Sequence, residues 1–382
     1  MLKPLELNHN CIDIIECVIK SGNISQNEIA NRTGINRSIV SKEMINLKSL
    51  NLINVNQSKN RNVISFNHHF ANTIIIEIDR FYIHAFLNSA LGYNIKKDSH
   101  KIDVLDVVTL FSKLEFIIDD FIDQSQVDII GIGVAVHGIV DKQHSIRFAP
   151  NTDWNDLNLK TALENKYNIF TTVVNVANVT AVSESVIADL GKDSLLSVTV
   201  HSGVGSGFVF DNRLFIGDNG YSLELGHFNL LNHNKPCSCG SKGCLETEIA
   251  YPQLIDQMSE LGIEDPSIDK LVQLYNLNDE KALTVYNNYL NYLAYGLKNL
   301  FLIVDPAIIK INCQILQQIP KSIEILKTKI YSPIIKYKDL SVSNLNSATR
   351  VFGLSIILCQ GYLGLSGVNL YTSKDELLIS YK

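Results

Sequence analysis

One stretch of the chain, residues 217–246, constrains the fold more than any other; it reads GDNGYSLELGHFNLLNHNKPCSCGSKGCLE. Three of the seven cysteines, Cys237, Cys239 and Cys244, fall within eight residues, and His227 lies ten positions upstream of the first. Three thiolates and one imidazole complete a tetrahedral zinc shell and leave no open position for water. Two glycines in this loop allow it to fold back on itself. We therefore expect a structural zinc site here, and not free cysteines on a glycine-rich loop.

The length and composition indicate an ordinary globular protein. A chain of 382 residues exceeds one ordinary domain, so we expect two or three. The first residues lack the apolar core of a signal peptide, and no apolar run reaches the length of a membrane span. The odd number of cysteines argues against a disulfide framework. We expect a cytoplasmic protein without a membrane partner.

The charge of the chain is unevenly distributed. The net charge is -6, but residues 1–65 carry eight Lys or Arg against five Asp or Glu. That segment therefore has a net charge of +3, which leaves -9 for the remainder. The asymmetry indicates a DNA-facing head on an acidic body.

The first fifty residues have the pattern of three short helices. Apolar residues recur at helical spacing within 11–19, which predicts the first helix. Ser25 and Glu28 have the spacing of a capping box at the start of a second helix. Gly34 suits a left-handed turn, and Asn36 suits the N-cap of a third helix. Helices joined in this way predict a helix-turn-helix with the third as the recognition helix.

The recognition helix and the segment after it supply the candidate DNA contacts. We expect the helix to bury an apolar face made of Ile39, Val40, Met44 and Leu47. Its exposed face is expected to reach phosphates and base edges through Arg37, Ser38, Ser41 and Lys42. Residues 52–67 alternate around a polar tip, which predicts a two-stranded wing that presents Lys59 and Arg61 to the DNA. A three-helix protein-docking module shares the helical pattern, but the basic excess and the wing favour double-stranded DNA.

The remaining residues, from 72 onward, predict an α/β sheet because strand and helix patterns alternate. Three short strands near 73–78, 82–88 and 93–98 are expected to form a meander. A helix over 104–122 and a buried strand over 127–138 follow. Further strands are expected at 170–175, 194–210 and 307–313, and further helices at 177–191, 279–302 and 351–363.

Six motifs follow one another in the order and approximate spacing of a known family: GIGVAVHG (131–138), APNTDW (149–154), VNVANVTAVSE (174–184), GVGSG (203–207), ELGH (224–227) and CSCGSKGCLE (237–246). On these motifs the chain resembles the ROK family of repressors and sugar kinases over nearly its full length. The resemblance implies a winged helix-turn-helix followed by a two-lobed, actin-like (ribonuclease H-like) sugar-kinase fold. The implied domains are a head at 1–70, a first lobe at 71–192 plus 360–382, and a second lobe with the zinc motif and a dimer surface at 193–359.

The resemblance also implies a sugar site. The matching positions, whose side chains hydrogen-bond sugar hydroxyls in the family, are Asn151, Asn175, Glu224, His227 and Glu246. Fixed amide, imidazole and carboxylate groups suit a polyol. We expect His227 to bind zinc through one ring nitrogen and sugar through the other, with zinc also anchoring Glu246. The alternative for the two glutamates is an ordinary surface position.

Two departures from the family pattern argue against catalysis, and a third concerns the sugar. Family kinases place an aspartate, the catalytic base, directly after the asparagine of the VN motif, but Val176 stands there and can accept no proton. Their glycine-rich phosphate turn is replaced by residues 77–82, EIDRFY, whose Asp79 would repel phosphate. We therefore expect no catalytic residue and no ATP. Leu223 replaces a glycine, and would either narrow the sugar site toward a pentose or pack away from it.

These features together predict a sugar-responsive transcriptional repressor. The segments FAPNTDWNDLNL and KPCSCGSKGCLE are most similar in sequence to those of ROK repressors of xylose-utilisation genes in low-GC Gram-positive bacteria. The resemblance implies a homodimer on a palindromic operator, released by D-xylose. The alternatives are a repressor that responds to another sugar or to a transport protein, and a sugar kinase with an incidental head.

Overall fold

The computed structural model describes residues 5–58, 61–79, 81–102, 106–150, 152–188, 193–346, 349–365 and 380–381. Contacts divide the chain into two units, Met1–Gly191 with Asn346–Lys382 and Lys192–Leu345. The second unit is therefore one continuous segment, inserted between the two segments that form the first unit. None of the helices in these described ranges has the length and apolar character needed to cross a lipid bilayer.

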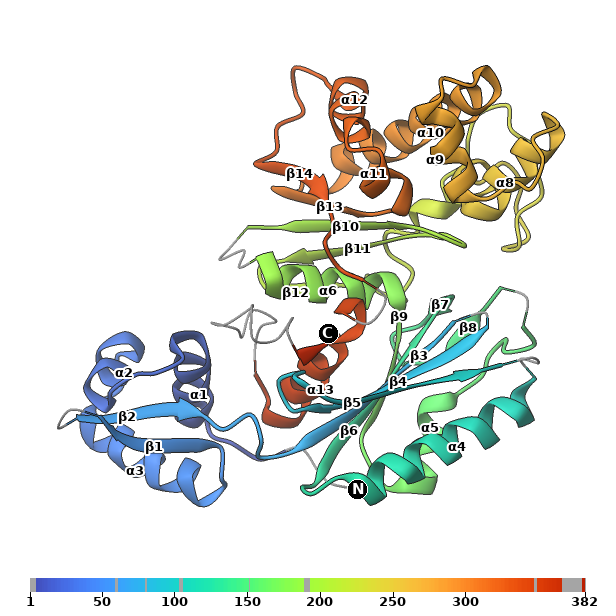
Figure 1. The fold of residues 1–382 in the computed structure, drawn as a ribbon. Coiled ribbons are helices and arrows are strands. Elements are labelled where there is room, and N and C mark those ends of the chain that lie inside the picture. Colours follow the sequence, from blue (N-terminus) through green and yellow to red (C-terminus); the bar gives the residue numbers. More distant parts are fainter. Residues whose placement is uncertain are drawn as a thin grey trace. The chain divides into compact units, whose positions relative to one another are not determined.

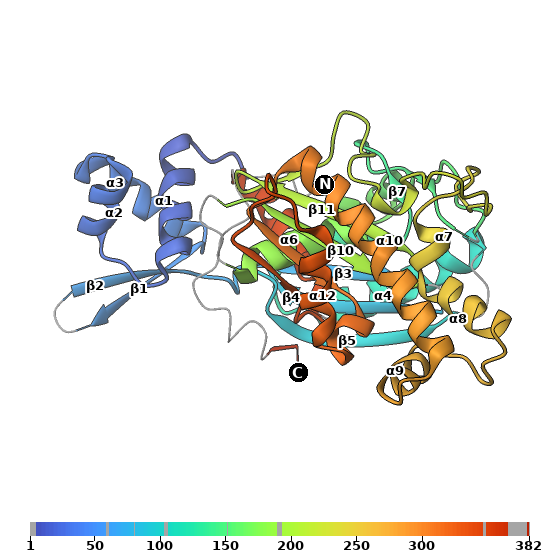
Figure 2. The same ribbon diagram turned by 90° about the horizontal axis from the view of Figure 1, so that it is seen from above.

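The first residues of the chain fold into a winged helix (Figure 1). Its elements are α1 (His9–Ser21), α2 (Gln26–Thr33), α3 (Arg37–Ser49), β1 (Ile53–Ser58) and β2 (Arg61–Phe66). The two strands pair antiparallel along their full length, and an isolated bridge joins Ile24 to Ile64. The hairpin extends from the three helices in Figure 2. The predicted wing is confirmed.

The predicted helix boundaries of this head are also confirmed. The Ser25 side chain accepts from the Glu28 N–H, and the Glu28 carboxylate accepts from the Ser25 N–H at 2.9 Å, which completes the capping box. Gly34 has φ +72°, a left-handed conformation that costs glycine little. Asn36 caps α3 by accepting from the Ser38 N–H at 2.9 Å.

One expected core position in this head was wrong. Ile39 is 39% exposed, whereas Glu43 is buried. The buried side chains of α3 are Val40, Glu43, Met44 and Leu47, which follow the i, i+3, i+4, i+7 spacing of one helix face. The Glu43 carboxylate accepts from Cys11 Sγ at 3.0 Å and from Asn8 Nδ2 at 3.2 Å. The apolar pattern predicts that Ile39 is buried, but the charged residue Glu43 is buried in its place.

The first unit contains a five-stranded sheet in the order β5-β4-β3-β6-β9. Its strands are β3 (Asn72–Ile78), β4 (Tyr82–Ser89), β5 (Asn94–Lys101), β6 (Ile129–Val136) and β9 (Thr171–Asn175). The first three form the predicted antiparallel meander, and β3, β6 and β9 run parallel. A small hairpin, β7 (Ile139–Val140) with β8 (Ile146–Phe148), follows β6.

Helices cover both faces of this sheet, with α4 and α5 on one side and α6 and α13 on the other (Figure 1). Their bounds are α4 (Val107–Gln124), α5 (Leu159–Tyr167), α6 (Val176–Ala188) and α13 (Gly353–Leu363), the last preceded by the 3-10 turn η2 (Thr349–Val351). Buried side chains of α4 and α5, such as Leu114 and Leu163, form one apolar cluster with β3 and β6. This α/β layering agrees with the predicted fold class.

The second unit repeats the sheet topology of the first. Its strands are β10 (Leu195–Val200), β11 (Val204–Phe210), β12 (Arg213–Phe215), β13 (Ile308–Asn312) and β14 (Asp339–Val342), in the order β12-β11-β10-β13-β14. In each unit the first three strands form an antiparallel meander. Two further strands lie beyond the first strand of this meander and run parallel to it. The remaining elements are η1 (Leu225–His227), α7 (Glu246–Ile249), α8 (Tyr251–Glu260), α9 (Ile268–Asn276), α10 (Glu280–Val304), α11 (Gln314–Gln318) and α12 (Lys321–Ile330).

Candidate metal centre and sugar site

The four predicted metal ligands converge in the second unit. One ligand atom each of His227, Cys237, Cys239 and Cys244 lies within 4.8 Å of the others. Sγ of Cys239 and Sγ of Cys244 are 3.7 Å apart, and Cys237 Sγ is 3.7 Å from His227 Nδ1. Zinc bonds of about 2.3 Å to sulfur and about 2.0 Å to nitrogen give a tetrahedral sulfur–sulfur edge of about 3.8 Å and a sulfur–nitrogen edge of about 3.5 Å. The donor set and its spacing fit zinc.

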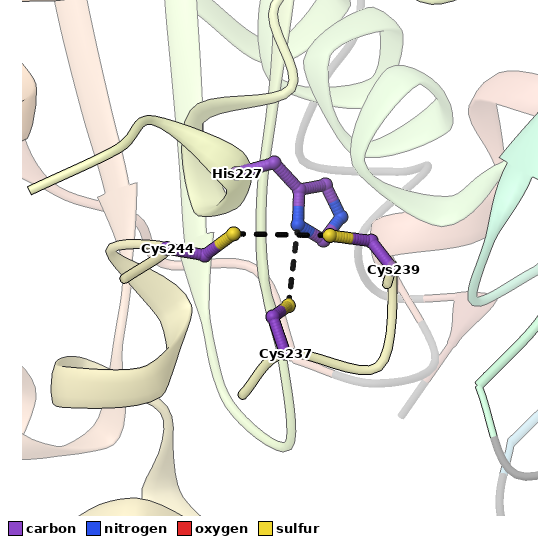
Figure 3. Close-up of side chains that lie close together, drawn as sticks. All are labelled: His227, Cys237, Cys239 and Cys244. Atoms are coloured by element: carbon purple, nitrogen blue, oxygen red, sulfur yellow. Dashed lines mark hydrogen bonds between the residues drawn. The ribbon is translucent and has the colours of Figure 1, made fainter. Parts of the chain in front are cut away.

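Figure 3 shows how the imidazole is placed within this cluster. Its Nδ1 faces the sulfurs, whereas the second ring nitrogen points away from them. A metal held through Nδ1 would therefore fix the tautomer of His227 and leave Nε2–H as an outward hydrogen-bond donor. This arrangement matches the division of roles expected for the ring.

Backbone hydrogen bonds shape the loop that carries the sulfurs. The Cys237 N–H donates to the Ser241 carbonyl at 2.9 Å, and the Leu230 N–H donates to the Gly243 carbonyl at 2.7 Å. At the base of the loop the buried Glu248 carboxylate accepts from Lys235 Nζ and contacts His233 Nδ1, both at 3.1 Å. The loop is therefore fixed to α7 by an ion pair as well as by any metal.

Two thiols of this cluster, those of Cys237 and Cys244, are hard to ionise without a cation. Burial, followed by the neighbouring thiols of Cys237 and Cys239, raises the pKa of Cys244 to about 12. Burial likewise raises the pKa of Cys237. A bound dication reverses this preference, because thiolates are its ligands.

Glu246 is held by the glycine turn between β10 and β11. Its Oε2 accepts from the Val204 N–H at 2.9 Å. A Cβ at Gly203 would lie 3.0 Å from that oxygen, so a side chain there would crowd the carboxylate. The GVGSG motif therefore has a use in this chain that involves no nucleotide. It positions Glu246 and leaves Oε1 available for a ligand.

Glu224 lies just before η1 in a half-buried position. Burial, with a smaller contribution from the charge of Glu246, raises the pKa of Glu224 to about 7. The residue before it, Leu223, has φ +63°, a conformation that favours glycine. Leu223 packs against the apolar core of the second unit, which supports the expectation that its side chain packs away.

Asn175 belongs to the first unit, at the end of β9. Its Oδ1 accepts from the Ala177 N–H at 2.7 Å, and its Nδ2 donates to the Gly138 carbonyl. One amide proton and one lone pair remain for a ligand. Val176, at the position of the kinase base, is buried and apolar. The structure thus places Glu224, His227 and Glu246 in the second unit and Asn175 in the first.

Some predicted contacts are not described. Asn151 and Lys59 lie outside the described residues, as does the side chain of Arg61. Among the α3 candidates, Arg37 and Lys42 are exposed. Ser38 and Ser41 are exposed as well, but their hydroxyls are already engaged: Ser38 Oγ donates to Asn36 Oδ1 at 2.9 Å and Ser41 Oγ donates to the Arg37 carbonyl at 2.9 Å.

A buried charge cluster in the first unit was missed by the sequence analysis. Glu77 of β3 is fully buried, and its Oε1 accepts from Arg350 Nε at 2.9 Å. His137 Nε2 lies 3.5 Å from the same oxygen and 3.9 Å from Asp79 Oδ1. The only signal in the sequence is a glutamate within the apolar run TIIIEI, since its partner lies 273 positions away.

Comparisons with known proteins agree with this architecture. The ROK family matches residues 106–349. The xylose repressor of Bacillus subtilis (strain 168) is 26% identical over 366 residues, which cover 92% of this chain and 95% of that protein. A glucokinase of Halalkalibacterium halodurans is 30% identical over 201 residues, covering 48% of this chain and 61% of the glucokinase.

Solved structures show the same fold. A ROK family transcriptional regulator, described as a homolog of the E. coli MLC protein, superposes with a TM-score of 0.81 at 20% identity, covering 97% of this chain and 98% of that one. A ROK family glucokinase from Streptomyces griseus gives a TM-score of 0.63 at 21% identity, covering 75% of this chain and 99% of that one. The full-length match includes the winged helix, and the match of the family to more than half of the residues shows that the chain belongs to the ROK family.

Proposed function

We propose that the chain is a sugar-responsive transcriptional repressor and not a kinase. The observation that carries the proposal is a winged-helix head joined to a ROK body in which the buried Val176 stands at the position of the catalytic base. An apolar side chain cannot take the proton from a sugar hydroxyl. The name of the Bacillus subtilis relative supports the repressor role and favours D-xylose as effector.

The sugar site in this proposal uses the residues that zinc and the glycine turn position. Zinc bound by His227, Cys237, Cys239 and Cys244 supplies rigidity and no catalysis. His227 Nε2–H and the carboxylates of Glu224 and Glu246 bind hydroxyls from the second unit, while Asn175 and Asn151 contribute amides from the first. A bound sugar favours the conformation of the chain in which these side chains lie within hydrogen-bonding distance of its hydroxyls.

DNA binding in this proposal belongs to the head. The recognition helix α3 enters the major groove of a palindromic operator, and a homodimer presents two such helices. Arg37 and Lys42 contact phosphates or base edges, with Lys59 and Arg61 of the wing beside them. Sugar binding changes the relation between the two heads and releases the operator.

Mobility-shift assays with operator DNA test the proposal. D-xylose at millimolar concentration is expected to weaken the shifted band, whereas D-glucose and xylose phosphate are not. An unchanged shift with every sugar would remove the inducer role. Sugar-dependent formation of ADP in a coupled assay, together with phosphorylated sugar as the second product, would instead establish a kinase.

Binding of sugar can be followed separately from DNA. Trp154 is the only tryptophan of the chain and lies three residues from Asn151. A saturable fluorescence change with one pentose is therefore expected in a titration with a panel of sugars. Failure of all free sugars to bind would favour a regulator that responds to a transport protein.

A further inference from the structure

The most exposed apolar side chain of the recognition helix lies on the face that the DNA proposal assigns to the operator. Ile45, in the third turn of α3, is 74% exposed. Val40, Met44 and Leu47 of the same helix are buried. An isolated exposed isoleucine is common on protein surfaces, so exposure alone decides nothing here. The direction in which Ile45 projects from the helix decides whether it faces the DNA.

Helix geometry places Ile45 at the centre of the exposed face. With about 100° of rotation per residue, it projects within about 20° of Ser38, seven residues earlier. Its direction lies between those of Ser41 and Lys42. Val40 and Leu47 project roughly 140–160° away, into the core of the head. Ile45 therefore points directly away from that core, along the axis by which α3 would enter a groove.

The serine hydroxyls around Ile45 already have hydrogen-bond partners within the protein. Much of the contact with bases on this face would therefore be made by Ile45. The Ser38 hydroxyl donates to the Asn36 cap, and the Ser41 hydroxyl donates to the backbone of its own helix while accepting from Gln26. Arg37 and Lys42 carry positive charge to either side of this face, which suits the phosphates that border a groove. The net charge of +3 on residues 1–65 favours a polyanion as the occupant of this face over a basic or neutral protein surface.

Thymine is the base that presents an apolar group, its 5-methyl, on the major-groove edge. We propose that Ile45 contacts a thymine methyl in each operator half-site and so sets the base preference at that position. This inference rests on the proposed DNA-binding function and adds a specificity determinant to it.

The test removes the methyl group from the DNA and the side chain from the protein. The full-length wild-type protein is first used to select a duplex from a random-sequence pool. Each thymine of that duplex is then replaced singly by deoxyuridine, which lacks the methyl but keeps the base pair. At one position per half-site the replacement is expected to weaken wild-type binding by about 3- to 10-fold. The Ile45→Ala protein should bind the thymine and deoxyuridine duplexes equally well.

Two further variants act as controls. Ile39→Ala removes an apolar side chain that is 39% exposed on the same helix but projects about 120° from Ile45. It should retain the full response to deoxyuridine. Lys42→Ala should weaken binding to all duplexes and flatten the salt dependence without changing the thymine preference. Since Ile45 is exposed, the alanine variant is expected to keep the wild-type circular dichroism spectrum.

The outcomes separate this inference from the proposed function. If deoxyuridine weakens wild type and Ile45→Ala equally, or at no position, the inference is overturned while DNA binding stands. If Ile45→Ala binds every duplex like wild type, the side chain is not at the DNA and the inference is likewise overturned. If the wild-type protein selects no sequence from the pool, the proposed function fails and the inference fails with it.

Discussion

At the scale of single residues, the His227 and cysteine cluster carries the clearest chemistry. Three sulfurs and one nitrogen at tetrahedral spacing would leave no room for a substrate on a metal, so a zinc ion bound here would be a structural element. The same few residues would hold the metal and aim the imidazole, and they lie directly before the helix that begins at Glu246. Metal binding and sugar binding should therefore be lost together.

Replacement of one sulfur tests this dependence. Cys239→Ser is expected to lose the bound zinc, because a three-ligand site cannot retain it against a chelator, and to lose sugar affinity with it. Metal content by elemental analysis and sugar titration by calorimetry measure the two effects. Cys17→Ser, which alters a partly exposed cysteine outside the cluster, is the matched control and should change neither. Loss of zinc with full sugar affinity would show that the metal is only a distant brace.

The sequence was sufficient to predict those site residues whose partners lie nearby in the chain. The metal ligands are close together in the chain, so their spacing alone identified them. The capping residues Ser25 and Asn36 were predictable for the same reason, because a cap acts within three residues. Partners far apart in sequence gave no such signal. Neither the contact of Glu43 with Cys11 nor the contact of Glu246 with Val204 is encoded in a local pattern.

At the scale of elements, β3 and η2 are joined by the buried pair of Glu77 and Arg350. The pair lies near the point where the chain returns from the second unit, at Asn346. Burial is the largest influence on the pKa of Glu77 and raises it, but contacts with His137 and Arg350 outweigh burial and hold the pKa below its ordinary value. The carboxylate is therefore ionised and paired at neutral pH.

Breaking this pair should destabilise the first unit. Arg350→Met leaves a buried carboxylate without its cation, at a cost of about 3–5 kcal/mol in the free energy of unfolding. The double variant Glu77→Gln with Arg350→Met should recover much of that loss, because no buried charge remains. Urea unfolding of the single and double variants measures the coupling. Equal costs for the single and the double variant would contradict a paired role.

The same pair sets a pH dependence. A folded pKa below the unfolded value means that the stabilisation is present above about pH 4.5 and is lost as the pH falls through the folded pKa. Wild type should therefore lose stability on acidification below that pH, and Glu77→Gln should lose less. Urea midpoints measured from neutral pH downward give the comparison. Parallel curves for the two proteins would show that other carboxylates account for the acid sensitivity.

The helix α13 is the element that links the return of the chain to the head. It follows η2 at one end, and at the other end the Tyr362 carbonyl accepts from the Leu5 N–H at 2.8 Å. The Tyr362 ring stacks on Phe70, just after the wing, with centroids 6.3 Å apart. A movement of α13 would reach the head through these contacts.

Tyr362→Ala is therefore expected to weaken the effect of sugar on operator binding while leaving the sugar affinity of the isolated protein unchanged. Fluorescence titration of Trp154 and mobility shifts measure the two quantities. Tyr362→Phe retains the ring stack and should behave like wild type. An alanine variant with an undiminished sugar response would place the coupling in another part of the molecule.

At the scale of the whole molecule, the sheets of the two units share the same topology, but the segments that connect their strands differ. The repeated order of strands was not visible in the sequence, because the two sheets share no motif and their long connections differ. The family resemblance supplied the two-lobed fold, and the structure added which side chains each unit contributes. Asn175 belongs to the first unit, and Glu224, His227 and Glu246 belong to the second.

The proposed function gives the chain two ligands, a sugar and operator DNA, which are bound by different residues. The proposed function then requires that sugar and operator oppose each other by equal factors, because the coupling free energy between two binding sites is reciprocal. If saturating D-xylose weakens operator binding tenfold, saturating operator must weaken D-xylose binding tenfold. That factor corresponds to about 1.4 kcal/mol.

Calorimetric titration of sugar into free protein and into the protein–operator complex measures one factor, and fluorescence anisotropy of labelled operator with and without sugar measures the other. Arg37→Ala should lower operator affinity in both anisotropy experiments and leave their ratio unchanged, because the proposed function gives Arg37 a contact with DNA and no part in the coupling. Unequal factors would mean that a third component, such as a change in oligomeric state, participates in release. Two factors of one would mean that the sugar, even if bound, does not control the operator, and the repressor would have to respond to a different signal.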